Sequence, residues 1–293
     1  LSADIVLKTP GDLIMGEKTL VEYTGLQPGG FVGNAACATS KLGLQTTWSG
    51  DLGKDMYAQV LLESFAEFNV NTDLVFQDPQ IQTNFCIVML HEDGDRTILI
   101  IHTHENPPPL TPEVLDALKS CKISYSPPYK PDWFKPYAEA VHSGAGRVAI
   151  DLETSSGLSE FELEQVISQT DIVFSNTRGI QRLGQPNLEQ NIEKIRALGC
   201  SFIVLTRGAD GSSLYSTEGV VHADGFSSNV VDTTGAGDCF HAAFMKGLLE
   251  SWEHYEILKY ANAAAALCIQ ELGPRNGLPT HQEILDFIHI QNN

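Results

Sequence analysis

The sequence predicts an α/β protein, with a mostly parallel central sheet covered by helices on both faces and a small separate β-sheet. Three observations lead to this prediction. Short apolar runs alternate with amphipathic segments between residues 123 and 206, which is the pattern of a parallel sheet buried on both faces. Residues 83–90 and 96–102 are strand-like runs joined by a charged turn that contains glycine, which is typical of a hairpin. A glycine-rich turn at 232–238 leads into a segment with the period of a buried helix.

In the N-terminal third, glycines and small residues mark places where a backbone can approach a ligand. Pro28–Asn34 is glycine-rich and precedes a helix that we expect to end at Leu42. The next expected elements are a strand at 46–49, a turn at 50–55 and a helix at 56–68. Asp55 is the expected N-cap of that helix. The hairpin at 83–102 should form a small sheet that stands off the main body, with its other strands supplied by residues 6–23.

The remaining two thirds of the chain predict the main body. The expected strands are 123–126, 148–152, 172–175 and 202–206, and the helices between them are 133–142, 160–169 and 188–198. They are followed by a hairpin at 211–215 and 219–222, a strand that ends at 228–231, a helix after the glycine-rich turn, and a helix at 255–272. Thr280 and Glu283 have the spacing of a capping box, which predicts a last helix.

The composition is that of an ordinary globular protein, with 293 residues, 42% of them hydrophobic and 19% charged. No apolar run approaches about 18 residues and no signal peptide is recognisable, so we expect no membrane span. A net charge of −19 argues against nucleic acid or an anionic membrane as partner. The six cysteines are scattered, which indicates free buried thiols, a reducing compartment and a cytoplasmic location. Among them, Cys239 is interpreted as a core residue and not as a nucleophile.

The turn Asp232-Thr233-Thr234-Gly235-Ala236-Gly237-Asp238 is the stretch that most clearly suggests chemistry. Glycines at the start of a helix leave backbone N–H groups open to an anion. Asp238 then lies where the anion arrives, which suits a base that takes a proton from a hydroxyl. The alternative is an acidic residue at a helix N-terminus, with glycines for close packing. The turn is not the G-x-x-x-x-G-K-[ST] phosphate loop, and Phe240 replaces the third glycine of the dinucleotide fingerprint, which disfavours a dehydrogenase.

The complete string D-T-T-G-A-G-D resembles the signature of the ribokinase family of carbohydrate kinases, the PfkB type. The resemblance spans nearly the whole chain and implies one ribokinase-like domain over residues 1–293, with a three-layer α/β/α body. It also implies a β-sheet lid built from about residues 5–27 and 80–105, which in the family covers the sugar and often joins two subunits. We therefore expect a homodimer formed through the lid.

The same resemblance implies roles for individual residues. Asp238 would be the catalytic base, with an anion hole formed by Gly235, Ala236 and Gly237. In the family, a G-G-x-x-x-N segment and an early Asp bind the sugar hydroxyls, and the matching residues are Asp4, Gly29, Gly30 and Asn34. The family also has a hydrophobic strand ahead of that Asp, and we expect this chain to begin after it.

On the nucleotide side, residues 206–211 resemble the family's T-x-G-x-x-G loop. Without the resemblance, this segment would be a plain strand-to-hairpin turn. The implied nucleotide contacts are Asn176, Thr206, Gly208, Gly211 and Asn262, with Arg207 as a nearby cation. Asp232 and Thr234, together with carbonyl groups of residues 268–277, resemble a monovalent-cation site that would hold K⁺. Gly277 stands where some relatives carry a serine ligand.

One departure from the family concerns the metal. Relatives have N-x-x-E after the third strand of the body, and its Glu organises Mg²⁺ through water. Here the sequence is Asn176-Thr177-Arg178-Gly179, so the Glu is missing. Either phosphates and water hold the metal with less help from the protein, or another acid replaces the Glu. Asp151 and Glu153 are the candidates.

The sequence thus predicts an enzyme that uses ATP and Mg²⁺ to phosphorylate a primary hydroxyl of a small sugar, such as a ribose or a fructose. One alternative is a nucleoside kinase of the same family, which needs an aromatic surface for the base. Phe31, Phe85 and Phe134 are the candidates for that surface. Another alternative is a non-catalytic module that senses a sugar or a nucleotide; the missing Glu favours it and the intact Asp238 opposes it.

Overall fold

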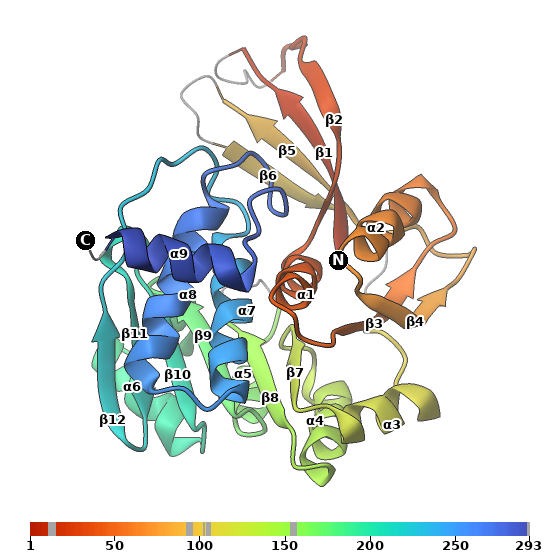
Figure 1. Cartoon of the computed structure of the whole chain (residues 1–293). Helices are drawn as coiled ribbons and strands as arrows, with labels where there is room; N and C mark the ends of the chain where they lie inside the picture. The colour runs from red at the N-terminus through yellow and green to blue at the C-terminus, as the bar shows by residue number, and fades with distance from the viewer. Residues whose placement is uncertain (11–15, 92–95, 102, 104–106, 153–156, 292–293) are drawn as a thin grey trace. The chain divides into compact units, whose positions relative to one another are not determined.

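The computed structural model describes residues 1–10, 16–91, 96–101, 103, 107–152 and 157–291. The chain divides into two compact units (Figure 1). Unit 1 contains Leu1–Ser40 and Gln45–Pro109, and unit 2 contains Lys41–Leu44 and Leu110–Asn293.

Unit 1 is built on a four-stranded sheet with the order β2-β1-β5-β6. Its strands are β1 (Ser2–Lys8), β2 (Glu22–Gly29), β5 (Phe85–Leu90) and β6 (Arg96–Ile101). β1 is antiparallel to β2 and parallel to β5, and β5 and β6 pair as an antiparallel hairpin. The predicted hairpin is therefore confirmed, although its turn residues and His102 lie outside the described residues. The other two strands extend beyond the predicted range of 6–23 at both ends.

Two helices and a second, two-stranded sheet complete unit 1. They are α1 (Phe31–Lys41), β3 (Thr47–Leu52), α2 (Met56–Glu67) and β4 (Asn71–Gln77), with β3 and β4 parallel. Asp55 caps α2 as predicted, because its Oδ1 accepts a hydrogen bond from Ala58 N at 2.8 Å. Its Oδ2 accepts another from Thr83 N at 2.8 Å, which ties the start of α2 to the residues before β5. β4 was not predicted, because most of its side chains are at least partly exposed and its sequence lacks a continuous apolar run.

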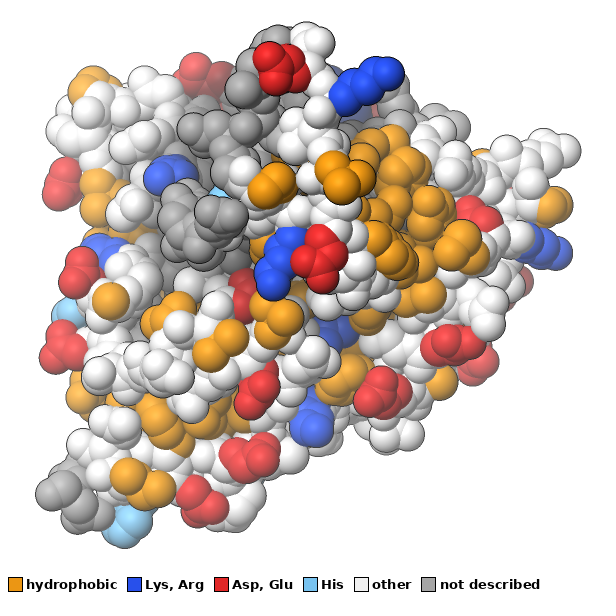
Figure 2. Space-filling model, turned by 90° about the horizontal axis from the view of Figure 1, so that it is seen from above, with side chains coloured by type: hydrophobic (Ala, Val, Ile, Leu, Met, Phe, Trp, Pro, Cys, Tyr) orange, Lys and Arg blue, Asp and Glu red, His pale blue; other side chains and the backbone are white. Residues whose placement is uncertain are grey.

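β6 is an edge strand of the four-stranded sheet and carries exposed apolar side chains. Ile98, Leu99 and Ile100 are 44%, 47% and 62% exposed. Figure 2 shows hydrophobic side chains gathered over part of one face of the molecule, with few charged groups among them. An apolar edge strand of this kind can pair with another chain.

Unit 2 contains a six-stranded sheet with the order β12-β11-β10-β9-β8-β7. Its strands are β7 (Ile123–Ser126), β8 (Arg147–Asp151), β9 (Ile172–Asn176), β10 (Phe202–Thr206), β11 (Ser212–Ser216) and β12 (Gly219–Ala223). β7 to β10 are parallel, whereas β11 and β12 are antiparallel additions at one edge. The predicted mostly parallel sheet is confirmed.

Helices cover both faces of this sheet. They are α3 (Pro112–Ser120), α4 (Pro131–Ser143), α5 (Glu160–Ile167), α6 (Leu188–Ala197), α7 (Ala236–Leu249), α8 (His254–Cys268) and α9 (His281–Gln291), with 3₁₀ turns η1 (Gly179–Leu183) and η2 (Gly208–Asp210). A core of α4, α5, α6 and η1 packs on alternate strand residues such as Val148, Ile150 and Val173. α7 and α8 run across the opposite face (Figure 1). This is the predicted three-layer α/β/α arrangement.

Two predictions for the C-terminal third are wrong. Residues 228–231 form no strand. Val230 and Val231 are 58% and 53% exposed, and the Val231 N–H bonds to the Ile269 carbonyl beyond the end of α8. α8 itself stops at Cys268 and not at 272, and the helix-breaking residues Gly273 and Pro274 follow within two turns. The capping box of α9 is confirmed, since Glu283 Oε2 accepts a bond from Thr280 N at 2.7 Å.

α3 was not predicted, although Thr111 caps it and Pro112 occupies its first position. All six cysteines are free, and five of them are buried, as expected. None of the described helices combines the length and the apolar character needed to cross a membrane.

Candidate active site

The glycine-rich turn lies at the N-terminus of α7 and requires glycine at one position above all. Gly235 is the N-cap and has φ +80°, a left-handed backbone that favours glycine. A Cβ placed there would lie 2.6 Å from the Pro274 carbonyl oxygen and 3.0 Å from Pro274 Cα. Gly235 therefore permits both the turn and the close approach of the segment after α8.

Asp232 organises this turn through hydrogen bonds to protein donors. Its Oδ1 accepts from Thr234 N at 2.9 Å and from Thr234 Oγ1 at 2.6 Å. Its Oδ2 accepts from Gly273 N at 2.9 Å. The carboxylate thus joins the signature turn to the 268–277 segment. The structure assigns Asp232 and Thr234 this structural task.

Asp238 lies in the first turn of α7 and is 9% exposed. The first-turn N–H groups of a helix have no intrahelical partner, and the Gly237 N–H donates to no described residue. A Cβ at Gly237 would meet nothing within 4 Å. The first turn of α7 therefore combines open space at the Cβ position of Gly237, a backbone donor with no described partner at the positive end of the helix dipole, and the largely buried residue Asp238. This arrangement can receive a phosphate and also accept a proton.

The predicted nucleotide loop, residues 206–211, follows β10. Its backbone packs closely against the backbone of residues 223–225. Gly208 and Gly211 have φ +58° and +82°, and a Cβ at Gly211 would lie 2.1 Å from the Ala223 carbonyl oxygen. Gly225 is packed equally closely, since its Cβ would lie 2.3 Å from the Ala209 carbonyl oxygen. Arg207 is occupied: its guanidinium donates to Ser213 Oγ at 2.6 Å, as well as to the Tyr215 hydroxyl.

Both asparagines predicted to contact the nucleotide bond to backbone groups. Asn176, the last residue of β9, accepts from Arg178 N at 2.9 Å and Gly179 N at 2.8 Å through its Oδ1. Asn262 on α8 donates through Nδ2 to the carbonyl oxygens of Ala223 and Asp224, each at 3.0 Å. Asn176 thus shapes the start of η1, and Asn262 anchors the segment that crosses the nucleotide loop.

The strand register places Asp151 on the α7 side of the sheet. Val148, Ile150 and Leu152 of this segment belong to the core on the α4–α6 side, so the alternating residue Asp151 faces the other way. Its register partner Phe174 contacts α7. Asp151 is 5% exposed, at the carboxyl end of β8.

Two other positions were considered for the metal. Gly179 is buried at the start of η1, and Glu153 lies outside the described residues. Among the described residues, no three Asp, Glu, His or Cys side chains form a metal-binding group.

Gly277 and Cys239 both pack closely against the C-terminal part of α8. A Cβ at Gly277 would lie 2.2 Å from the Cys268 carbonyl oxygen, so a serine has no room there. Cys239 is 1% exposed, and its Sγ lies 3.4 Å from the Ala264 carbonyl oxygen. The adjacent Cys268 thiol and burial raise the pKa of the Cys239 thiol. Cys239 is therefore a core thiol, as predicted.

Unit 1 brings the predicted sugar-binding residues together. A Cβ at Gly29 would lie 2.2 Å from Asp4 Oδ2, so the Gly29 backbone lies directly against the Asp4 carboxylate. Gly30 has φ +84° and approaches the backbone of Leu1 and Ser2. Asn34 is 4% exposed, and its backbone N–H donates to the Gly30 carbonyl oxygen at 2.9 Å. Asp4 itself lies within β1, where it accepts a bond from Ser2 Oγ at 3.1 Å, a contact that the sequence did not suggest.

The three phenylalanines considered for base stacking differ. Phe134 is fully buried in the core between α4 and the sheet, so it cannot stack on a ligand and that assignment is wrong. Phe85 is partly buried and stacks on Tyr57, with ring centroids 5.0 Å apart. Phe31 is the first residue of α1.

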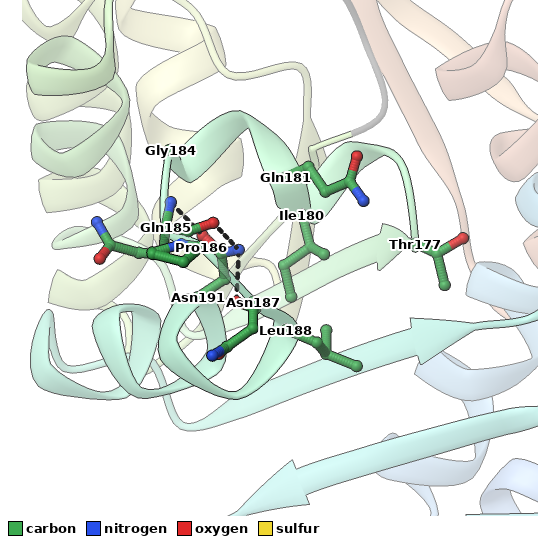
Figure 3. A pocket seen from close by; sticks show the side chains of 9 residues that line it. All are labelled: Thr177, Ile180, Gln181, Gly184, Gln185, Pro186, Asn187, Leu188 and Asn191. Atoms are coloured by element: carbon green, nitrogen blue, oxygen red, sulfur yellow. Dashed lines mark hydrogen bonds between the residues drawn. The ribbon is translucent and has the colours of Figure 1, made fainter.

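A hollow of about 440 Å³ opens beside η1 and the start of α6 (Figure 3). Its wall contains amide side chains that serve internal hydrogen bonds. Asn191 is 1% exposed, donates to the Asn187 carbonyl at 2.9 Å and accepts from Gln185 N at 3.2 Å. Asn187 Oδ1 caps α6 by accepting from Gln190 N. The amides of Asn187 and Asn191 therefore stabilise the start of α6 and the segment before it.

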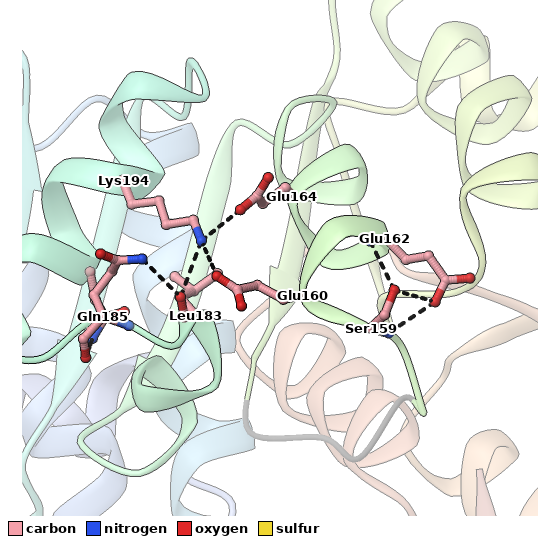
Figure 4. Close-up of polar contacts among 8 residues, drawn as sticks. Ser159, Glu160, Glu162, Glu164, Leu183, Gln185 and Lys194 are labelled. Atoms are coloured by element: carbon pink, nitrogen blue, oxygen red, sulfur yellow. Dashed lines mark hydrogen bonds and ion pairs between the residues drawn. The ribbon is translucent and has the colours of Figure 1, made fainter.

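Behind η1, Lys194 connects three elements in a way that the sequence did not reveal (Figure 4). Its Nζ lies 2.5 Å from Glu160 and 2.6 Å from Glu164, and it donates to the Leu183 carbonyl at 3.1 Å. The two carboxylates raise the pKa of Lys194. This cluster secures the far end of η1, and so supports the turn that Asn176 begins.

Comparison with known proteins identifies the family of this chain. A family model described as pfkB family carbohydrate kinase matches residues 1–281. A ribokinase of Arabidopsis thaliana is 28% identical over 274 residues, which cover 89% of this chain and 72% of the relative. Fructokinase-2 of Oryza sativa subsp. japonica is 25% identical over 276 residues, which cover 86% of this chain and 82% of the relative.

The fold agrees as well. The solved structure of Arabidopsis thaliana ribokinase complexed with ribose and ATP superposes with a TM-score of 0.84 and 25% identity. The match covers 98% of this chain and 96% of that one. With its signature turn at the start of α7 and a family match over nearly its whole length, the chain belongs to the pfkB family of carbohydrate kinases.

Proposed function

We propose that this protein transfers the γ-phosphoryl group of ATP to a primary hydroxyl of a small sugar of the ribose or fructose kind, with Asp238 as the general base. The observation that carries the proposal is the start of α7. There, the largely buried Asp238 adjoins a glycine turn in which the Gly237 N–H has no described acceptor and the Cβ position of Gly237 faces open space. Relatives named ribokinase and fructokinase, and a related structure with ribose and ATP, support the choice of substrates.

In this scheme the sugar hydroxyl loses its proton to Asp238 as its oxygen attacks the γ-phosphorus. A new oxygen–phosphorus bond forms, the bond to the bridging oxygen breaks, and ADP leaves with that electron pair. Backbone N–H groups at Gly235, Ala236 and Gly237 face the charge that spreads over the transferred group. Asp232 keeps these donors in place through its three hydrogen bonds, so the turn needs little rearrangement when the phosphate arrives.

Sugar binding is assigned to unit 1. Asp4 and Asn34 offer a carboxylate and an amide for sugar hydroxyls, and Gly29 and Gly30 allow the backbone to pack closely around Asp4 and the start of β1. The nucleotide is assigned to the 206–211 loop of unit 2, with Thr206, Gly208 and Gly211 as contacts. Asn176 and Asn262 contribute chiefly through the backbone segments they hold.

The residues present fit a magnesium ion that is bound chiefly by the nucleotide. Asp151 supplies one carboxylate at the carboxyl edge of the sheet, on the side of α7, and would replace the missing Glu near Gly179. When bound with ATP, Mg²⁺ neutralises phosphate charge. A K⁺ ion at Asp232 and Thr234 would add positive charge beside the anion turn.

We further propose that the four-stranded sheet of unit 1 is a lid over the sugar and pairs two subunits through β6. The support is its apolar edge strand. Leu99→Lys should convert a dimer into a monomer in sedimentation velocity. Ile290→Lys in α9, which changes a side chain that is 69% exposed, is the matched control and should leave the mass unchanged. A parent protein that sediments as a monomer would refute the pairing.

The function is tested by ADP release with ATP and Mg²⁺ across ribose, fructose, phosphorylated sugars, sugar acids and nucleosides. Asp238→Asn serves as the inactive control. Turnover with a free sugar supports the proposal, and turnover with nucleosides alone favours the nucleoside kinase. If calorimetry detects sugar or ATP binding but no panel member releases ADP, the non-catalytic sensing module is the better description.

A further inference from the structure

His241 is a polar residue of α7 that the phosphoryl-transfer scheme leaves unused. It is 4% exposed and lies three residues after Asp238, so the two side chains share one side of the helix. Burial lowers the pKa of the imidazole to about 3, so it is neutral at physiological pH. A neutral imidazole that has lost nearly all its water is costly unless its contacts compensate.

The contacts of His241 form a clamp between α7 and the sheet. The imidazole stacks on Phe174 of β9, with ring centroids 4.1 Å apart and 28° between the planes. Its Nδ1 lies 3.0 Å from the hydroxyl of Tyr125, on β7. The Tyr125 ring stands edge-on to both His241 and Phe174. Because β8 lies between β7 and β9, the imidazole bridges the strand that ends at Asp151.

The hydrogen bond distinguishes this contact from ordinary core packing. An apolar side chain could fill the same volume and slide along the Phe174 ring at little cost, because apolar contact is not directional. A bond between a ring nitrogen and a hydroxyl is directional, so it fixes the rotation and the height of the helix. Asp238 lies about 4.5 Å further along the same rigid helix. Any shift at His241 therefore reaches Asp238 with no loop in between to absorb it.

We propose that His241 is a positioning residue: with Tyr125, it sets the height of Asp238 and of the anion turn over the carboxyl ends of β7 to β9. The proposal rests on the proposed phosphoryl transfer. Its main effect is on the geometry of the transfer, because most of the nucleotide is assigned to the 206–211 loop, to which neither His241 nor Tyr125 belongs.

A double-mutant cycle tests the pair. Tyr125→Phe removes one oxygen atom, and His241→Leu removes the other partner. Each should lower kcat by about 10–100-fold, because displacing a reacting group by about 1 Å has an effect of that size. The dissociation constant for ATP should stay within about threefold. The double variant should be no slower than the worse single variant, because the second change removes a bond already lost.

Two further variants separate positioning from stability. His241→Asn retains a hydrogen-bonding group near the place of Nδ1 and should recover most of kcat. Phe244→Leu changes the next turn of α7, where the Phe244 ring meets Phe174 edge-on at 5.4 Å. It should lower the melting temperature without a matching fall in kcat. If His241→Leu does not fold, Tyr125→Phe and His241→Asn still decide the question.

The inference is overturned if the kcat losses of Tyr125→Phe and His241→Leu multiply in the double variant. It is also overturned if either single variant keeps kcat within about twofold of the parent, far short of the expected loss. Failure of the proposed function looks different, because the parent itself would then release no ADP with any sugar. In that case the slow hydrolysis of ATP by water is measured in the same variants.

Discussion

Replacing Gly235 by alanine should damage the start of α7, whereas the same change at Gly237 should not. Gly235 has φ +80°, which costs an L-residue about 1–2 kcal/mol. The new methyl group would also lie 2.6 Å from the Pro274 carbonyl oxygen, and forced overpacking of this kind costs about 1–3 kcal/mol. Reduced freedom of the unfolded chain returns about 0.4–1 kcal/mol. Taking the middle of each range, the net loss for Gly235→Ala is about 3 kcal/mol.

Gly237 is the matched control, because it lies inside the first turn and a Cβ there meets nothing within 4 Å. Gly237→Ala should stabilise the protein by about 0.5–1 kcal/mol, the ordinary gain of alanine over glycine in a helix. Its methyl group would nevertheless enter the space in front of the anion turn, so ADP release should fall even though stability rises. Gly235→Ala should lose both stability and activity.

Thermal unfolding followed by circular dichroism measures the difference. At about 2–4 °C per kcal/mol, Gly235→Ala should melt about 5–15 °C below the parent and Gly237→Ala slightly above it. A Gly235→Ala protein as stable as Gly237→Ala would refute the reasoning, because neither the positive φ nor the contact with Pro274 would then carry a cost.

Three further predictions concern charge and proton transfer. Asp238→Asn should lower kcat by about 10²–10⁴-fold with a modest change in the dissociation constant of the sugar. Asp232→Asn should lower kcat by a smaller factor than Asp238→Asn. An Asp238→Asn protein with kcat within about threefold of the parent would contradict the assigned base. Activity should need Mg²⁺, and Gly179→Glu should raise Mg²⁺ affinity by about 10-fold or more in titrations of the ATP-bound protein; a folded variant with no gain would remove position 179 from the metal site. The pKa of His241 is about 3 in the folded state and 6.5 in the reference state, so between those values the unfolded chain holds more protons and stability falls as pH falls. The contribution is at most about 5 kcal/mol, and urea titrations at pH 7 and pH 4 should show a smaller loss for His241→Asn than for the parent.

The strands of the parallel sheet could be predicted almost residue by residue. Phe202–Thr206 matches β10 because a strand buried on both faces is a continuous apolar run with polar residues at its ends. The helix caps could be predicted equally well, because Asp55 and Thr280 accept hydrogen bonds from residues only a few positions away. Elements whose stability comes from distant contacts could not be found. β4 exists because β3 pairs with it, and its own residues are half exposed.

The candidate site shows the same division. Gly235 is predicted from its lack of a side chain and Gly211 from the family resemblance, and each meets a backbone from elsewhere in unit 2. The identity of the partner segments, Pro274 and Ala223, depends on the fold. Asn262 was selected as a ligand contact, but its amide donors bond to Ala223 and Asp224. No role for His241 is predicted from the sequence, because a single histidine on an apolar helix indicates no function by itself. Its role depends on the contacts with Tyr125 and Phe174, which only the structure shows.

The coverage of the six-stranded sheet has a consequence for synthesis of the chain on the ribosome. All six strands are complete at Ala223, whereas the helices that cover one face, α7 and α8, span Ala236–Cys268. Until those residues emerge, the nascent sheet would expose Phe174 and its neighbours to water. Transiently exposed apolar surface of this kind promotes aggregation and attracts chaperones. We expect pauses in translation after residue 223 to lower the yield of folded protein more than pauses within unit 1, whose strands are complete by Ile101.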